Sequence, residues 1–245
     1  MVRALSDSEL FEAWERGFEL ESAQRPLAFL QAVYPDTEEE ELLQWSIGRC
    51  NADLVSLRQG RFGSQMEGVV SCPKCGQTLE LTFSTAEICA EQQENTDHGL
   101  TVSKGDYRLW FRLPTAQDLA DAARLRDHAS ARTRMLEACL MEAKRNDEKC
   151  SLEELPETAV TAMVKKMEEA DTQGSVLREL SCPECDHQWQ TTFDIGAFLW
   201  TETDAWARRM LRDVHTLASA YGWQEEKILK MTPRRRQFYL DMVNE

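Results

Sequence analysis

The stretch VSCPKCGQTLELTF, residues 70–83, decides the organisation of this chain, because its plan returns as LSCPECDHQWQTTF, residues 180–193. In each copy a serine precedes the first cysteine, a proline follows it, and the second cysteine stands three positions after the first. A phenylalanine stands eleven positions after the first cysteine in both copies. The residues after each cysteine pair alternate between polar and apolar, which is typical of a half-buried strand. The sequence therefore predicts two matching turns, each flanked by strands.

The two copies together predict one metal site. A C-x-x-C turn holds two thiolates at the spacing that a tetrahedral metal requires, and two such turns complete the four-thiolate shell of structural zinc. We expect one zinc per chain in a zinc ribbon that is split by a long insertion. A shell of four thiolates leaves no position for water or substrate, so the zinc is expected to be structural rather than catalytic. The predicted ligands are Cys72, Cys75, Cys182 and Cys185.

Other uses of these cysteines remain open. They can be free thiols in two surface turns, and the same shell can hold iron in a rubredoxin-like site. A redox dithiol is disfavoured, because that motif opens a helix and strand-like sequence follows both pairs here. His187 is interpreted as a surface histidine. The other cysteines lack paired spacing and are expected to be unliganded, with one of them in the core of a helical stripe: Cys50, Cys89, Cys139 (the core residue) and Cys150.

Charge and composition restrict the partners. The chain has 245 residues, enough for one large or two small domains, and its formal net charge of −15 disfavours a general nucleic-acid binder. Residues 1–60 carry twelve acidic and five basic side chains, whereas residues 205–245 carry five acidic and eight basic ones. No apolar leader opens the sequence and no run of apolar residues is long enough to span a membrane. We therefore expect a cytoplasmic protein with reduced thiols.

Periodicity predicts an α+β fold that is mostly helical, with a small antiparallel zinc-ribbon sheet split by a helical insertion. The expected regions are an N-terminal helical region (1–63), the first half of the ribbon with a hairpin (64–113), a helical insertion (114–173), the second half of the ribbon (174–200) and a C-terminal helical module (201–245). Capping boxes at Ser6 with Glu9 and at Thr115 with Asp118 predict helix starts. Lys104-Gly105-Asp106 predicts the turn of the hairpin.

Several helices are predicted from apolar stripes. DTEEEELLQWSIGRC, residues 36–50, is expected to be one helix that buries Leu42, Leu43 and Ile47. Ser151 with Glu154 is expected to open another, with Val160, Met163, Val164 and Met167 on its buried side. A further stripe is formed by Leu136, Cys139, Leu140 and Ala143. We find no phosphate-binding glycine loop, HExxH motif or nucleophile elbow, so we do not expect an enzyme.

The C-terminal stretch DVHTLASAYGWQEEKILKMTPRRRQFYLDMV, residues 213–243, predicts three helices. The first ends at Gly222 and the third begins at Thr232-Pro233. Phe238, Tyr239, Met242 and Val243 are expected to pack. A helix-turn-helix that binds DNA is one interpretation, but the negative net charge favours a helical module that contacts protein.

The same stretch resembles the closing motif of phage-type baseplate proteins of contractile injection systems, the T-even-like baseplate hub assembly chaperone family. Residues 13–35, 48–63, 70–83, 112–123 and 193–215 resemble the same proteins. The resemblance implies a non-enzymatic protein that assembles the baseplate of a contractile phage tail or injection system, with baseplate or tail proteins as partners. It implies metal binding by the four paired cysteines and a contact module with His215, Tyr221 and Gly222, and with the predicted partner-binding residues Trp223, Arg234, Arg235 and Arg236.

Two other functions stay open at this stage. One is a zinc-ribbon adaptor that binds nucleic acid through its basic C-terminal helices. The other is an enzyme whose catalytic residues come together only in the folded chain.

Overall fold

The computed structural model describes residues 2–88 and 99–244, and within them the chain is an α+β protein that is mostly helical. The helices are α1 (Asp7–Glu19), α2 (Arg25–Val33), α3 (Glu39–Leu43), α4 (Ile47–Phe62), α5 (Ala116–Ala123), α6 (His128–Cys139), α7 (Glu157–Ala170), α8 (Ile195–Tyr221), α9 (Glu225–Leu229) and α10 (Pro233–Asn244). The strands are β1 (Gln65–Ser71), β2 (Thr78–Ser84), β3 (Leu100–Lys104), β4 (Tyr107–Phe111), β5 (Leu140–Arg145), β6 (Glu148–Lys149), β7 (Val176–Ser181) and β8 (Gln188–Phe193).

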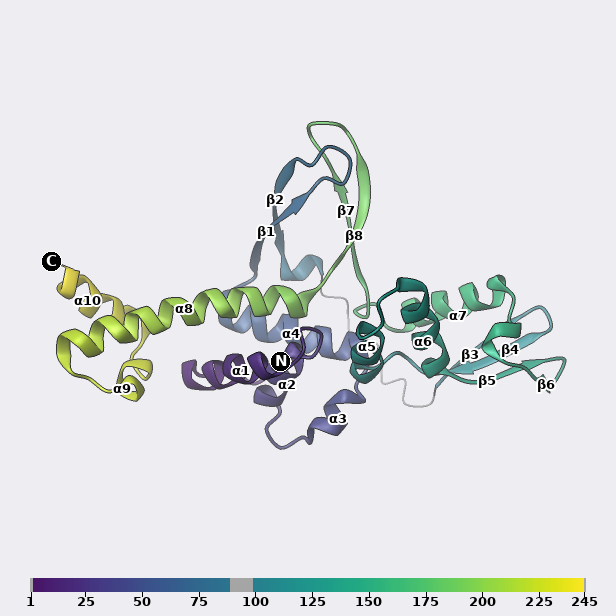
Figure 1. The fold of residues 1–245 in the computed structure, drawn as a ribbon, viewed down its shortest axis with the longest axis horizontal. Coiled ribbons are helices and arrows are strands. Elements are labelled where there is room, and N and C mark those ends of the chain that lie inside the picture. The colour runs from purple at the N-terminus through teal and green to yellow at the C-terminus, as the bar shows by residue number, and fades with distance from the viewer. Residues whose placement is uncertain (1, 89–98, 245) are drawn as a thin grey trace.

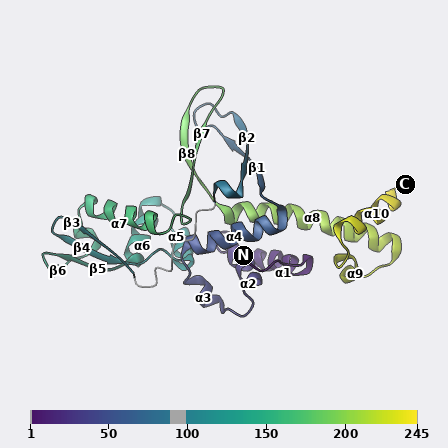
Figure 2. The same ribbon diagram turned by 180° about the vertical axis from the view of Figure 1, so that it is seen from behind.

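The long helix α8 runs from the base of the hairpins to the C-terminal helices, and the N-terminal helices pack along it (Figure 1). The hairpins β1–β2 and β7–β8 rise together from this helical body. The sheet β3-β4-β5-β6 lies at one end with α6 and α7, and α9 and α10 lie at the other, as the view from behind also shows (Figure 2). Cys89 lies outside the described residues, so its expected lack of a ligand stays a prediction.

The N-terminal helices form the largest core. The predicted capping box is present, because Ser6 accepts from the backbone N–H of Glu9 and the Glu9 carboxylate accepts from the Ser6 N–H. Pro26 stands in the first turn of α2, as predicted. Helices α1, α2 and α4 bury their apolar faces together with the start of α8 and the base of β1–β2. The fully buried side chains of this core are Leu10, Phe29, Leu30, Leu42, Leu54, Met66, Ile195 and Leu199.

The helix predicted over residues 36–50 is wrong in its extent. Helix α3 ends at Leu43, and α4 begins at Ile47 with Ser46 as its N-cap. The hydroxyl of Ser46 accepts from the N–H of Arg49, which starts a new helix instead of continuing the old one. The break is held by the chain that precedes α5, because the N–H of Ile47 donates to the carbonyl oxygen of Pro114 at 3.0 Å.

The insertion is only partly helical. The predicted helical stripe is wrong beyond Cys139, because α6 ends there and Leu140–Arg145 forms β5 against β4. Without β5, strand β4 would keep an edge of unpaired backbone groups, and pairing them outweighs the weak helical preference of this stretch. The missed signal is Asn146-Asp147, whose φ angles of 49° and 68° fit a tight hairpin turn between β5 and β6.

The sheet has its own core under α6 and α7. Leu109 and Phe111 of β4 pack with Met163 of α7 and with the end of α6. The Ser151 capping box is present, but it opens a single 3-10 turn (Leu152–Glu154), and α7 begins only after Pro156. Proline lacks the N–H that a continuous helix would need inside it, which explains the delay.

Helix α8 is longer than predicted at its start. Asp194 caps it by accepting from the N–H of Ala197, so the residues after Phe193 are helix rather than ribbon. It ends at Gly222, whose φ of 66° is the left-handed conformation predicted for a helix stop. The predicted packing of Phe238 and Met242 is wrong, because these side chains are 58% and 54% exposed, and Leu240 is buried instead.

No helix in the described ranges, residues 2–88 and 99–244, has the length and apolar character needed to cross a membrane.

A backbone-to-carboxylate hydrogen bond helps to join the start of α4 to the end of α7. The N–H of Gly48 donates to Oδ2 of Asp171 at 2.9 Å. A Cβ at residue 48 would lie 1.5 Å from Oδ1 of the same carboxylate, so any other residue there must displace that carboxylate. Gly60 lies in the same helix and has open space around it.

We expect Gly48→Ala to lower the free energy of unfolding by about 2 kcal/mol, because the methyl group displaces the Asp171 carboxylate. Gly60→Ala is the matched control and should raise the free energy of unfolding by about 0.5 kcal/mol, since alanine favours helix over glycine. Urea unfolding of both variants measures the difference. Equal effects of the two substitutions would contradict the proposed role of the Gly48–Asp171 contact.

Candidate metal centre

The four predicted ligands lie at the tips of two hairpins that are separate sheets. In the first, Ser71 of β1 pairs with Thr78 of β2, and in the second Ser181 of β7 pairs with Gln188 of β8. Each hairpin therefore ends in a six-residue turn that begins with its first cysteine. Figure 1 shows the two hairpins rising from the helical body and converging toward their tips, and Figure 2 shows the same from behind.

The two turns have the same backbone hydrogen bonds. The N–H of Cys72 donates to the carbonyl oxygen of Gln77 at 2.8 Å, and the N–H of Gly76 donates back to Cys72 at 2.9 Å. In the second turn the same bonds, both 2.9 Å long, join Cys182 with His187 and with Asp186. The repeat that is visible in the sequence is thus a repeat of one local structure.

The residue after the second cysteine has a left-handed backbone in both turns. Gly76 has a φ of 76°, and Asp186 has a φ of 53°. Glycine adopts this conformation without strain, and aspartate tolerates it better than most residues. These two positions were not predicted from the sequence, although they are where CPKCG differs from CPECD after the second cysteine.

The four sulfur atoms form one compact cluster. All lie within 4.8 Å of one another, with Sγ of Cys72 3.8 Å from Cys185 and Sγ of Cys75 3.6 Å from Cys182. A zinc–sulfur bond of about 2.3 Å places the sulfurs of a tetrahedral site about 3.8 Å apart, whereas a disulfide requires about 2.05 Å. The donor set therefore fits a tetrahedral thiolate site, and the four residues can hold a metal ion.

Burial differs between the two cysteines of each pair. Cys72 and Cys182, the first of each pair, are buried, whereas Cys185 is partly exposed and Cys75 is exposed. One face of the cluster thus meets solvent, which gives an ion a path to the site.

The electrostatics of the cluster favour ionisation of one thiol first. Desolvation opposes ionisation of Cys72, but the N–H groups of Cys75 and Lys74 donate to its sulfur and lower its pKa to about 7. At Cys75 the N–H of Gln77 acts in the same sense, but desolvation and the neighbouring thiols raise its pKa to about 12. The pKa of Cys185 is also raised. Without a cation the four thiols cannot ionise together, because their negative charges repel.

The hairpins also contact each other at their base. At the base the rings of Phe83 and Phe193 lie 5.2 Å apart, and Arg178 forms an ion pair with Glu87 at 3.0 Å. These phenylalanines are the ones that recur eleven positions after each first cysteine, so the repeat defines the contact at the base as well as the cluster at the tip.

The other cysteines that the structure describes, Cys50, Cys139 and Cys150, are not part of the cluster. Among the described residues, the four tip cysteines form the one group of three or more His, Cys, Asp or Glu side chains whose ligand atoms are close enough to share an ion. Burial raises the pKa of Cys50 to about 12 and that of Cys139 to about 11, so both stay protonated at neutral pH. His187 stacks on Trp189, with ring centroids 5.8 Å apart.

The predicted partner-binding residues lie at the other end of the molecule, and their environments differ. Trp223 is partly buried in an aromatic cluster with Tyr221 and Tyr239, at centroid distances of 4.5 and 4.8 Å. Arg234 and Arg235 are exposed. The side chain of Arg236 is only 6% exposed, because it forms ion pairs with Asp7 of α1 and Asp213 of α8, both at 3.5 Å. The three consecutive arginines thus divide into two surface residues and one internal residue.

Comparison with known proteins gives one match. The family model described as "T4 bacteriophage base plate protein" matches residues 54–200, which is more than half of the chain. This range holds both hairpins with all four tip cysteines, and the sheet with α5, α6 and α7. No curated protein and no solved structure matches the chain.

The left-handed position in the second turn can be tested directly. We expect Asp186→Val to destabilise the chain by about 1–2 kcal/mol, because a β-branched residue is strained at positive φ. Asp186→Gly should keep or slightly raise the stability. Glu184→Val is the control in the same turn at a position without positive φ, and thermal unfolding measures all three. Equal destabilisation by the two valine substitutions would contradict a backbone origin of the effect.

Proposed function

We propose, given that this chain belongs to the T4 bacteriophage base plate protein family, that it is a non-enzymatic assembly factor or structural component of a contractile-tail baseplate. The family match over residues 54–200 is the observation that carries the proposal. The finer proposal is a role like that of a baseplate hub assembly chaperone, in a phage tail or a contractile injection system, with baseplate or tail proteins as partners.

The resemblance of residues 13–35 and 213–243 to the same class of proteins supports this finer proposal. Both segments lie outside the matched range, and both are integrated in one fold. Helices α1 and α2 pack on α8, and α10 packs back on α8. The aromatic cluster around Trp223 and the exposed Arg234 and Arg235 then form a surface that is suited to an acidic partner protein.

We further propose that the tip cluster binds one zinc ion in a structural role. The sulfur separations of 3.6 and 3.8 Å support this assignment, because they match a tetrahedral thiolate shell. When bound, zinc supplies a cross-link between the two hairpins and offers no open coordination position for chemistry. The chain contributes the turn N–H groups that donate to the sulfurs, and the phenylalanine contact that aligns the hairpins at their base.

We expect purified protein to contain about one zinc per chain. Cys72→Ser should lower both the zinc content and the thermal stability, because metal binding contributes folding free energy when the site joins two separate sheets. Cys150→Ser is the control, since Cys150 is partly exposed and lies outside the cluster. Elemental analysis and thermal unfolding measure the two effects.

Three results would contradict the zinc assignment. Protein without metal, or with two ions per chain, would exclude one shared structural ion. Iron in place of zinc would keep the site and change the cofactor.

The role in assembly can be tested at the exposed arginines. The experiment uses cells that express all proteins of the contractile tail or injection system. There, Arg234→Glu with Arg235→Glu should strongly reduce the yield of assembled particles, because it reverses the charge of the proposed contact surface. Arg236 is left intact, since its buried ion pairs stabilise the fold. Arg126→Glu with Arg134→Glu is the control, because it makes the same charge change at exposed residues elsewhere.

Electron microscopy of the particles gives the yield, and circular dichroism verifies the fold of each variant. Normal assembly with the Arg234 and Arg235 double variant would exclude this contact surface. Tight binding of wild-type protein to duplex DNA at about 0.15 M salt would favour the nucleic-acid adaptor instead.

A further inference from the structure

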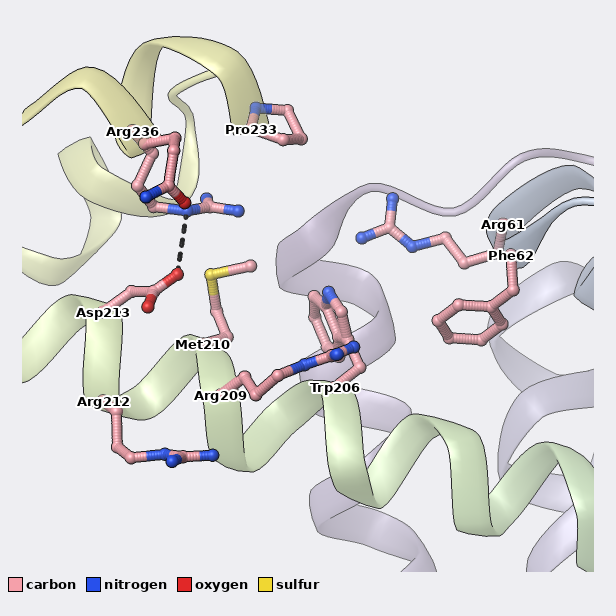
Figure 3. Close-up of a pocket in the computed structure, with 10 residues that line it drawn as sticks. Arg61, Phe62, Trp206, Arg209, Met210, Arg212, Asp213, Pro233 and Arg236 are labelled. Atoms are coloured by element: carbon pink, nitrogen blue, oxygen red, sulfur yellow. Dashed lines mark ion pairs between the residues drawn. The ribbon is translucent and has the colours of Figure 1, made fainter. Parts of the chain in front are cut away.

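A basic cleft lies at the junction of α4, α8 and α10. Its volume is about 580 Å³, and the ten side chains drawn in Figure 3 line it. Four of them are arginines, Arg61 from α4, Arg209 and Arg212 from α8, and Arg236 from α10, whereas Asp213 is the one acidic lining residue. A concentration of positive charge of this kind contrasts with a chain whose formal net charge is −15.

The inner part of the cleft is already ordered by ion pairs within the chain. Arg61 and Arg236 both pair with Asp7, and Arg236 also pairs with Asp213, the contact drawn as a dashed line in Figure 3. The two inner guanidinium groups are therefore balanced by two carboxylates. Their positions are fixed in the folded protein before any ligand arrives.

The outer part of the cleft has two arginines, which interact with Asp213 electrostatically but not as ion pairs. Arg209 and Arg212 are exposed, and neither forms an ion pair within the part of the chain that the structure describes. Arg212 donates its Nε to the carbonyl oxygen of Arg208 at 3.1 Å, which leaves its terminal nitrogens for another acceptor. The rim thus offers two guanidinium groups to a negatively charged ligand.

The cleft also has an apolar side. Trp206, Phe62 and Met210 line it, and the Arg61 guanidinium lies 5.1 Å from the centre of the Trp206 ring. An apolar wall excludes water and strengthens charge pairing at its edge. The ligand that fits has carboxylates for the arginines and an apolar side chain for the tryptophan.

We propose that this cleft binds an acidic peptide segment of a partner protein, with its carboxylates on Arg209 and Arg212 and an apolar side chain against Trp206. Guanidinium groups bind carboxylates through two parallel hydrogen bonds, which gives orientation as well as affinity. The identification of the partner as a baseplate or tail protein rests on the proposed function. The chemistry of the cleft does not depend on it.

The charge distribution favours a peptide over a nucleic acid. Binding to DNA draws its affinity from many phosphate contacts along a basic surface. Here four arginines are gathered in one cleft, and the net charge of −15 on the whole chain repels a polyanion. A short acidic segment brings few charges and can reach the cleft without passing along the acidic surface.

The test uses the full chain and a fluorescently labelled peptide that alternates glutamate with leucine, titrated at about 0.15 M salt. We expect saturable binding by fluorescence anisotropy. Arg209→Glu with Arg212→Glu should weaken it at least about tenfold, because two charge contacts become repulsive. Arg126→Glu with Arg134→Glu changes the net charge equally and should leave the affinity within about twofold of wild type. A peptide with glutamine in place of glutamate should not bind.

Other results would overturn the inference. They are absence of peptide binding, equal weakening by both double variants, and tighter binding of an unlabelled DNA duplex that Arg209→Glu with Arg212→Glu abolishes. Particle assembly is measured separately with the same variant. If the variant loses peptide binding but particles assemble normally, the cleft binds acidic peptides but has no role in assembly. If the Arg209→Glu with Arg212→Glu variant binds the peptide normally, the inference that the cleft binds acidic peptides is wrong, whatever the assembly result.

Discussion

The approach of four sulfur atoms at the tips of two hairpins is the constraint on which the rest of the structure depends. A two-stranded hairpin is marginally stable by itself, and here two of them stand apart from every other sheet. They meet at Phe83 and Phe193 below and at the cysteines above. Since the first hairpin precedes the α6–α7 sheet lobe and the second follows it, both ends of that lobe are anchored on the same support.

Helix α8 connects the hairpins to the N-terminal core and to the C-terminal helices. Its first turns complete the N-terminal core, its middle packs on Phe11, and its last turns hold α9 and α10. Glu202 of α8 pairs at 2.7 Å with Arg58 of α4, whose side chain is only 3% exposed. Removing one partner of such a buried pair leaves an uncompensated charge, so the contact fixes the relative position of the two helices. The arginine cleft is lined by residues of the same two helices, so its shape depends on their relative position.

Local signals made much of this predictable from the sequence. The paired cysteines, the Ser6 and Thr115 capping boxes and the Gly222 stop each describe interactions between near neighbours, which the chain carries with it. The failures are long-range. Leu140–Arg145 is a strand because β4 offers an edge, and Arg236 is buried because aspartates from α1 and α8 surround it. The cysteine cluster could be predicted from the sequence because its two halves have the same cysteine spacing. The arginine cleft is lined by residues from three helices, and these residues share no repeated sequence motif.

Because α8 is one uninterrupted helix, it fixes both the distance and the rotation angle between the surfaces at its two ends. Its 27 residues span about 40 Å at 1.5 Å per residue, from the base of the hairpins to the C-terminal helices. One residue added within it would lengthen the rod by about 1.5 Å and would turn everything beyond the insertion by about 100°. The surfaces at its two ends are therefore related in direction as well as in distance. Partners held at both ends would receive a defined angular register from a single helix.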